Sequence, residues 1–142
     1  MVRKEMFRYP WKINGKRWHL YQVCNVEMRE KVLSMIKILE ENFEATGPYW
    51  DTKDYVYYRR PGENVIWLKL ETQKTVLRLY FYVRQGSFDE SQLKSTLHPG
   101  VTIVPSRKFG ERIGFTIDNK FDIYNSKFIS FIREIYQKSR IK

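Results

Sequence analysis

Apolar and polar residues alternate in two neighbouring segments near the middle of the chain, residues 64–71 and 75–84. A period of two is typical of a β-strand with one buried face, because successive side chains point to opposite sides. Residues 55–60 form a third β-rich run, and turn residues separate the three runs at 61–62 and 72–74. The pattern therefore predicts a three-stranded antiparallel meander. Its buried face is expected to consist of Ile66, Leu68, Leu70, Leu77, Leu79, Phe81 and Val83.

Two longer segments repeat their apolar residues at spacings of three and four, as one face of an α-helix does. The first covers residues 26–45, with Asn25 as its N-cap and Gly47-Pro48 as its end. The second covers residues 125–138. The apolar stripes are Val32, Met35, Ile36, Leu39 and Phe43 in the first helix, and Phe128, Phe131, Ile132 and Ile135 in the second.

The N-terminal segment predicts a β-hairpin. Asn14-Gly15 is a strong hairpin signal, because both central residues of a type I′ turn need positive φ. The flanking runs, residues 7–13 and 16–23, are rich in aromatic and β-branched residues. Pro10 cannot donate a hydrogen bond to a neighbouring strand, so the first strand of this hairpin is expected at a sheet edge.

The remaining segments complete an α+β fold. A short helix is expected at residues 88–97, capped by Ser87, and two further strands at residues 101–104 and 112–117. The chain then runs hairpin, helix, meander, short helix, two strands, helix. This order predicts a mainly antiparallel sheet covered on one face by two main helices, with an N-terminal β-hairpin.

Length and composition fit one globular domain: 142 residues, of which 42% are hydrophobic. We expect a single domain over residues 1–142, with residues 1–23 as a basic hairpin extension and residues 26–138 as the core. No apolar run approaches the roughly 18 residues of a membrane helix, and the N-terminus lacks the apolar segment of a signal peptide. The single cysteine, Cys24, cannot form an internal disulfide. A cytoplasmic protein without membrane contact is expected.

The charge of the chain is strongly positive. It carries 26 Lys and Arg against 16 Asp and Glu, a net charge of +10. Residues 1–20 hold six cations and one acid, and residues 119–142 hold six cations and two acids. Such a charge suits an anionic partner, nucleic acid above all, although it is also compatible with a surface that is merely soluble.

The outward positions of the meander place cations beside aromatic rings. Several single-strand binders hold nucleic acid in this way, by stacking rings on bases and contacting phosphates. The same residue types also pack across strands in ordinary sheets, so a purely structural role stays open. The candidate nucleic-acid-binding residues of this face are Trp67, Lys69, Arg78, Tyr80, Tyr82 and Arg84. Further phosphate contacts are expected from Lys12, Arg17, Arg107 and Lys108. The pattern does not distinguish DNA from RNA as the partner.

A protein-interaction module is the alternative function, because Tyr, Trp and Arg are also enriched at interface hot spots. It would dock a protein partner, or a second copy of the chain as a homodimer, through the same aromatic face. The two functions predict different surroundings for the rings. A protein interface should bury Trp67 and Tyr82 amid few free cations, whereas a nucleic-acid face should leave Arg78 and Arg84 exposed beside the rings.

Residues able to carry catalysis are scarce. His19 and His98 are the only histidines, and with one cysteine there is no zinc cluster at a recognisable spacing. Residues 51–53, Asp-Thr-Lys, have the form of half a metal-dependent nuclease site, which needs a second acid such as Asp54 or Glu63. We expect no cofactor and no metal, and a binding module in preference to an enzyme. A metal-dependent nuclease is the enzyme alternative that stays open.

A set of loosely spaced segments resembles a small uncharacterised family of accessory domains. They are a helix that ends at Phe43, the run Gly-Pro-Tyr-Trp at 47–50 and the strand at 54–58. The Leu-Arg-Leu strand at 77–79 and the Phe-Asp-Ile at 121–123 before the last helix complete the set. The resemblance covers about three-quarters of the chain and leaves the N-terminal hairpin outside. Domains of this family are often found C-terminal to predicted nucleases and restriction-type proteins. The resemblance implies an accessory or recognition domain without established catalytic residues.

Overall fold

Residues 14–23, 25–43, 46–62, 65–107 and 110–139 are described by a computed structural model of the chain. Six strands form one antiparallel sheet in the order β1-β2-β3-β4-β6-β5. Strand β6 therefore lies between β4 and β5 in the sheet, although β5 comes before β6 in the sequence. The strands are β1 (Thr46–Tyr49), β2 (Val56–Arg59), β3 (Ile66–Thr72), β4 (Leu77–Val83), β5 (Thr102–Ser106) and β6 (Gly110–Ile117).

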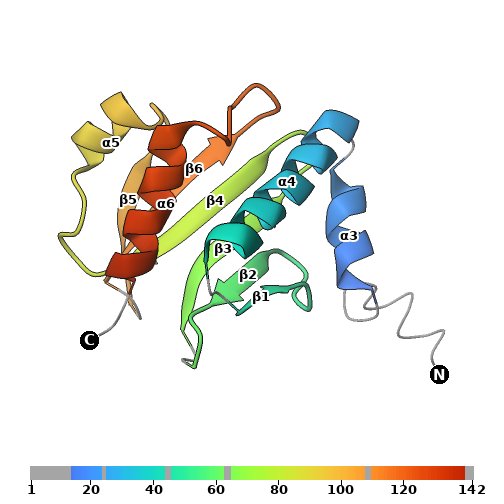
Figure 1. The fold of residues 1–142 in the computed structure, drawn as a ribbon, viewed down its shortest axis with the longest axis horizontal. Coiled ribbons are helices and arrows are strands. Elements are labelled where there is room, and N and C mark those ends of the chain that lie inside the picture. The colour runs from blue at the N-terminus through green and yellow to red at the C-terminus, as the bar shows by residue number, and fades with distance from the viewer. Residues whose placement is uncertain (1–13, 24, 44–45, 63–64, 108–109, 140–142) are drawn as a thin grey trace.

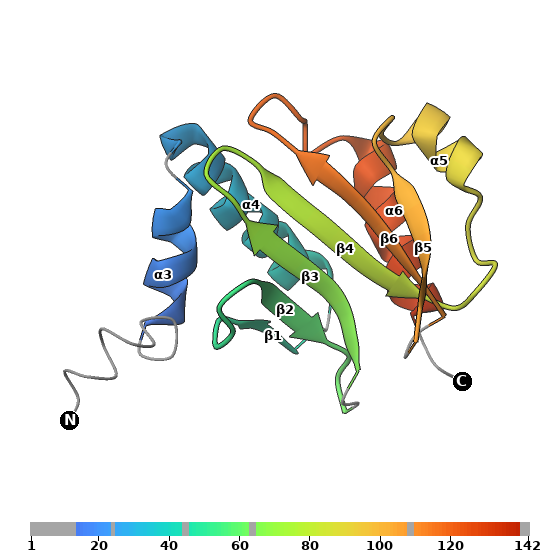
Figure 2. The same cartoon turned by 180° about the vertical axis from the view of Figure 1, so that it is seen from behind.

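Helices cover one face of this sheet. The described helices are α3 (Gly15–Gln22), α4 (Val26–Asn42), α5 (Glu90–Thr96) and α6 (Ser126–Lys138). Helices α4 and α6 lie across the same face, α3 lies beside α4, and α5 lies near the β5 edge (Figure 1). Seen from behind, strands β3, β4 and β6 lie in front and no described helix crosses them (Figure 2). The predicted α+β fold with an antiparallel sheet is thus confirmed, whereas the predicted layout of two main helices and an N-terminal hairpin is matched only in part, because four helices are described.

The core forms where the predicted apolar stripes meet the sheet. Asn25 and Asn125 cap α4 and α6, their side chains accepting from the backbone N–H of Met28 and Lys127. The ring of Phe131 on α6 meets the ring of Phe81 on β4 edge-on, with centroids 5.2 Å apart. The predicted inward residues that are buried are Leu68, Leu70, Leu77, Leu79, Phe81 and Val83 from the sheet, with Val32, Met35, Ile36, Leu39, Phe128, Phe131, Ile132 and Ile135 from the helices.

The prediction of an N-terminal β-hairpin is wrong for its second strand, residues 16–23. Residues 15–22 form helix α3, and Asn14 acts as an N-cap whose Oδ1 accepts from Arg17 N at 3.2 Å. Asparagine suits an N-cap as well as a type I′ turn, so the Asn-Gly dipeptide alone does not distinguish the start of a helix from a hairpin turn. Tertiary contact favours the helix: a Cβ on Gly15 would lie 2.0 Å from Trp50 O, so this glycine lets the helix start touch the loop before β2. The other predicted strand, residues 7–13, lies outside the described residues.

The end of α4 and the N-cap of α5 differ from the prediction, because other residues stand at these helix ends. Helix α4 ends at Asn42, and Gly47-Pro48, expected to end that helix, lies within β1 instead. A proline is tolerated there because β1 is an edge strand, where a missing N–H breaks no ladder. Helix α5 is capped by Asp89 rather than Ser87, the Asp89 carboxylate accepting from Ser91 N at 2.9 Å.

Trp67 was expected on the outward face of the sheet, and this is also wrong. Tyr58 on β2 lies opposite Leu68, and Arg59 lies opposite Ile66, so Trp67 is an extra residue without a cross-strand partner. Such a bulge re-aims a side chain. The Trp67 ring is fully buried on the helix side, 5.7 Å from the ring of Phe43 and 5.1 Å from that of Tyr136. Ile66, on the far side of the bulge, is only half-buried.

Candidate functional site

The strands bring tyrosines and cations together on the sheet face opposite α4 and α6. Tyr57, Lys69 and Tyr80 lie in one row across β2, β3 and β4, because each is the cross-strand partner of the next. On β4 the alternation of side chains adds the residues two positions before and after Tyr80 to the same face. We refer to this surface as the tyrosine–cation face; it consists of Tyr49, Tyr55, Tyr57, Arg59, Lys69, Arg78, Tyr80, Tyr82 and Arg112.

Each cation of this face lies over aromatic rings. Lys69 Nζ is 4.2 Å from the centroid of the Tyr55 ring and 5.3 Å from that of Tyr82. The guanidinium carbon of Arg59 is 5.1 Å and 5.4 Å from the rings of Tyr49 and Tyr57, which stack on each other. Cation–π contacts of this kind fix the positive groups close to the sheet surface. The cations and rings of this face therefore form a connected set of contacts.

Tyr80 occupies the centre of the array, between two arginines. The guanidinium carbons of Arg112 and Arg78 lie 4.5 Å and 5.2 Å from its ring centroid. Its cross-strand partner on β6 is Gly114. Tyr80 is partly exposed, whereas Tyr82, two residues further along β4, is enclosed with 7% of its surface exposed. Tyr80 is thus the ring of β4 that a ligand can reach.

The electrostatics of the face are positive. Among the described residues, the four cations Arg59, Lys69, Arg78 and Arg112 stand against two acids at this face: Glu71 on β3, and Asp51 before β2, which accepts a hydrogen bond from the Tyr57 phenol. Burial raises the pKa of the phenols of Tyr80 and Tyr82 above their ordinary value. Glu71 adds to this effect at Tyr80, where Arg78 and Arg112 oppose it only in part, and Arg112 opposes it only in part at Tyr82. Both phenols are therefore neutral near pH 7 and do not cancel the cations.

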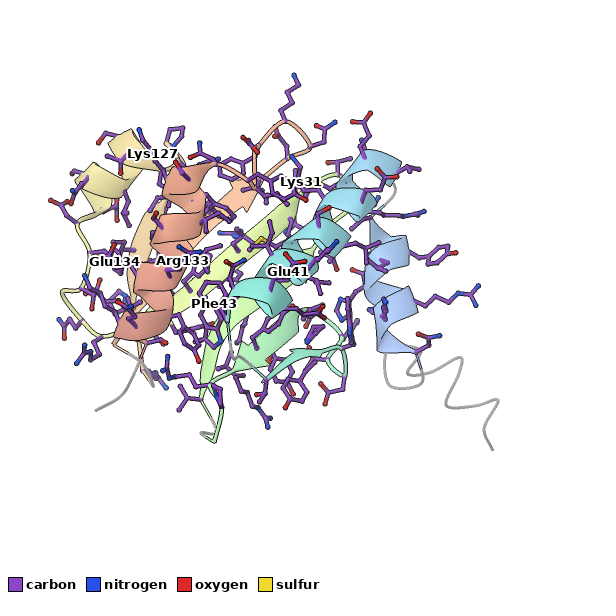
Figure 3. The ribbon with its side chains drawn as sticks, in the orientation of Figure 1. Lys31, Glu41, Phe43, Lys127, Arg133 and Glu134 are labelled. Atoms are coloured by element: carbon purple, nitrogen blue, oxygen red, sulfur yellow. The ribbon has the colours of Figure 1, made fainter. Side chains whose placement is uncertain are left out.

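The opposite side of the molecule carries mixed charge. Figure 3 shows Lys31 and Glu41 on α4, and Lys127, Arg133 and Glu134 on α6, with acids and cations interspersed. Lys37 and Glu41 form an ion pair at 4.0 Å, and Arg133 donates to Asn42 Oδ1 at 3.0 Å between the two helices. Within the described residues, acids are thus interspersed with the cations of these two helices, whereas cations outnumber acids on the tyrosine–cation face.

The structure brings four of the predicted binding residues together. Lys69, Arg78, Tyr80 and Tyr82 all lie on the tyrosine–cation face. Arg84 is exposed just beyond the end of β4, where its backbone N–H donates to Lys138 O.

The other predicted binding residues lie elsewhere. Trp67 is in the core and does not belong to the face. Arg17 is exposed on α3 and contacts the ring of Tyr21, and Arg107 is exposed in the turn after β5. Lys12 and Lys108 lie outside the described residues. The sequence prediction missed Tyr49, Tyr55, Tyr57, Arg59 and Arg112; alternation within 55–59 and 112–117 contains the signal for all of them except Tyr49.

The two histidines considered for catalysis form hydrogen bonds with groups of the fold itself. His19 is buried, with Nε2 2.7 Å from Thr52 O and Nδ1 3.2 Å from Thr72 Oγ1. His98 Nδ1 accepts from Gly100 N at 2.9 Å within a turn. In the part of the chain that the structure describes, no three residues of His, Cys, Asp or Glu gather in a metal-binding group. Glu63 and Cys24 lie outside that part.

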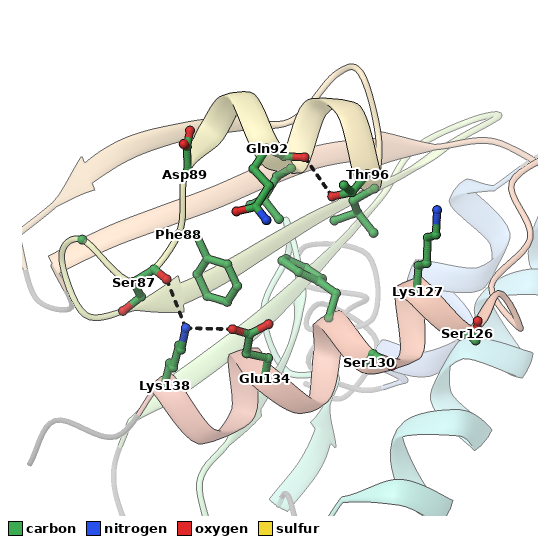
Figure 4. Close-up of a pocket in the computed structure, with 14 residues that line it drawn as sticks. Ser87, Phe88, Asp89, Gln92, Thr96, Ser126, Lys127, Ser130, Glu134 and Lys138 are labelled. Carbon is green, nitrogen blue, oxygen red and sulfur yellow. Dashed lines mark hydrogen bonds and ion pairs between the residues drawn. The ribbon is translucent and has the colours of Figure 1, made fainter.

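A groove between α5 and α6 is a second surface feature. Its volume is about 710 Å³, and its walls include Gln92 and Thr96 from α5 and Ser126 and Ser130 from α6 (Figure 4). Lys138 closes one end by contacting Ser87 O at 3.2 Å and Glu134 Oε1 at 2.8 Å. Two acids and two cations line the groove, so it lacks the excess charge of the tyrosine–cation face.

Comparisons of the chain with known protein families, with curated proteins and with solved structures found no significant match. The resemblance to accessory domains therefore stays a prediction. Within the described residues, none of the helices is both long enough and apolar enough to cross a membrane.

Proposed function

We propose that this protein is a non-enzymatic nucleic-acid-binding module and that the tyrosine–cation face is its binding surface. The observation that carries the proposal is the exposed Arg78 beside Tyr80 and Arg112, on a sheet face that no described helix covers. Phosphates need cations within reach, and bases need accessible rings. Both are present on this face within a few ångströms of each other.

The rival function, docking of a protein through the same face, fits the surroundings of the rings less well. Charged residues are depleted at the centre of a protein interface, while arginine is enriched in the interface as a whole. Here Arg78 and Arg112 flank the central ring, and Trp67, expected as a hydrophobic anchor of such an interface, is enclosed in the core. Light scattering over a concentration series tests the homodimer version of the rival, which requires association of the unmodified protein.

Fluorescence anisotropy with labelled single-stranded and duplex DNA and RNA tests the proposal. We expect binding that weakens steeply between about 50 and about 200 mM salt, because each neutralised phosphate releases condensed counterions. The double substitution Arg78→Ala/Arg112→Ala should weaken binding at least tenfold at low salt and reduce the slope against salt concentration, by about 0.7 to 0.9 for each lost phosphate contact.

A matched control removes the same charge elsewhere. Lys37 on α4 and Lys120 in the turn before α6 are exposed and lie outside the tyrosine–cation face. Lys37→Ala/Lys120→Ala lowers the net charge equally and should change affinity much less. Equal losses in the two double variants would mean that only net charge matters, and no binding of any nucleic acid at low salt would refute the proposed function.

A further inference from the structure

The ring of Tyr80 leans across the neighbouring strand because its partner there has no side chain. A Cβ at position 114 would lie 3.2 Å from Tyr80 Cδ1 and 3.3 Å from Cε1. The ring therefore occupies the space that a side chain on β6 would fill. Arg112, two residues before Gly114 on the same strand, brackets the ring on that side. A glycine in the interior of a strand often marks such a close approach.

This position gives Tyr80 the properties of a stacking surface. The ring is partly exposed, is held by two guanidinium groups and lies against the sheet, so little conformational freedom is lost when a planar ligand stacks on it. Guanidinium planes also stack on bases and contact phosphates, so Arg78 and Arg112 extend the same surface. Tyr57 and Tyr82, 6% and 7% exposed, cannot offer a ring in this way.

The shape of the face favours an unpaired strand over a duplex. Proteins that read duplex DNA insert a helix or a two-stranded ribbon into a groove. Within the described residues, the tyrosine–cation face is a sheet surface without a helix on it (Figure 2), and the Tyr80 ring lies close to β6 at Gly114. The bases of a duplex are stacked on one another and cannot reach Tyr80, whereas those of a single strand can be splayed onto it.

We infer that the ligand of this face is single-stranded nucleic acid, with one base stacked on the Tyr80 ring and its neighbouring phosphates held by Arg78, Arg112 and Lys69. This rests on the proposed function and adds the class of nucleic acid and the residue that recognises it. Stacking on one ring does not read the edges of a base, so binding tolerates different sequences.

Anisotropy titrations with a single-stranded DNA, a single-stranded RNA and a duplex of the same length test the inference in wild type, Tyr80→Ala and Tyr80→Phe. We expect the single strands to bind at least tenfold more tightly than the duplex. Tyr80→Ala should weaken single-strand binding about tenfold or more, the usual loss when a stacking ring is removed, with the slope against salt unchanged. Tyr80→Phe keeps the ring and should retain most of the affinity.

Tyr124→Ala is the matched control, because that tyrosine is 67% exposed and lies in the loop before α6, outside the face. Circular dichroism melts show whether each variant folds. If duplex binds as tightly as single strands, or if Tyr80→Ala and Tyr124→Ala behave alike, the inference fails while salt-dependent nucleic-acid binding stands. If no nucleic acid binds, the proposed function fails and the inference with it.

Discussion

Cationic side chains have two different tasks in this molecule. Arg60 is 4% exposed and donates to Tyr136 O and to Ser139 Oγ at the end of α6, where backbone carbonyls lack helical partners. Lys31 likewise donates to the carbonyls of Asn119 and Phe121 in the loop before α6. These charges hold the fold together. The net charge of +10 therefore overstates the cations that a ligand meets, and the exposed Arg78 is one that it does meet.

At the residue scale, His19 predicts how stability depends on pH. Burial lowers the pKa of its imidazole, against the smaller opposing effects of the Thr52 carbonyl and Asp54. The neutral ring donates through Nε2 to Thr52 O, so Nδ1 accepts from Thr72 Oγ1. Below the ordinary value of 6.5 the unfolded chain binds the proton more readily than the folded one, so stability falls as pH falls through that region.

We expect the unfolding midpoint of the wild type to decrease from neutral pH towards mildly acidic pH. The contribution of this one proton is at most about 1.4 kcal/mol per pH unit. His19→Gln removes the titration and should flatten that part of the profile, at some loss of stability at neutral pH. His98 is present in both proteins and serves as the internal control. Parallel pH profiles in thermal melts of the two proteins would show that His19 is not the responsible group.

At the element scale, local patterns predicted those strands and helices that bury one face and expose the other. Alternation identified β3 and β4, and spacings of three and four identified α4 and α6, because each has one buried face. The failures involve non-local contacts. Asn14-Gly15 begins a helix because Gly15 meets Trp50, and Trp67 turns inward at the β2–β3 bulge to pack against the rings of Phe43 and Tyr136. Neither contact is visible in a local pattern.

The residues of the candidate site likewise fall into those that a local pattern predicts and those that depend on the strand order. Lys69, Arg78 and Tyr80 were predicted from alternation within one meander. Arg112 joins them only because β6 pairs with β4, more than 20 positions earlier in the sequence, and that strand order is not local information. The role of Gly114 depends on the same pairing.

The β5 edge supports a prediction about self-association. An edge strand with free backbone donors invites pairing with another chain. On β5 the outward N–H of Ile103 donates to Glu90 Oε2 at 3.0 Å, and Pro105, two residues further, has no N–H. We expect Glu90→Ala to free this donor and to produce dimers or larger species at high protein concentration, measured by light scattering.

Lys94→Ala is the control for that experiment. Lys94 forms an ion pair with the other oxygen of the same carboxylate, Glu90 Oε1, at 3.0 Å, so its removal leaves the cap on Ile103 in place. It should leave the oligomeric state as in the wild type. If both variants stay as monodisperse as the wild type, the hydrogen bond from Ile103 N to Glu90 is not what prevents this edge from pairing.

At the scale of the whole molecule, the two faces of the sheet have separate tasks. Helices α4 and α6 seal one face with apolar side chains, and their outer surfaces carry balanced charge (Figure 3). No described helix crosses strands β3, β4 and β6 on the other face (Figure 2), where Arg78 is exposed and Tyr80 is partly exposed. Because the rigid core lies between them, a ligand on the sheet face can bind without rearranging the helices.

This separation predicts where a bound strand changes the protein. In two-dimensional NMR spectra titrated with a short single-stranded oligonucleotide, the largest backbone amide shifts should lie on β3, β4 and β6, around Lys69, Tyr80 and Arg112. Amides on the outer surfaces of α4 and α6 should shift little, because the sheet lies between them and the ligand. Shifts concentrated on the α5–α6 groove, around Gln92 and Ser130, would instead place the ligand there and exclude the tyrosine–cation face as the binding surface.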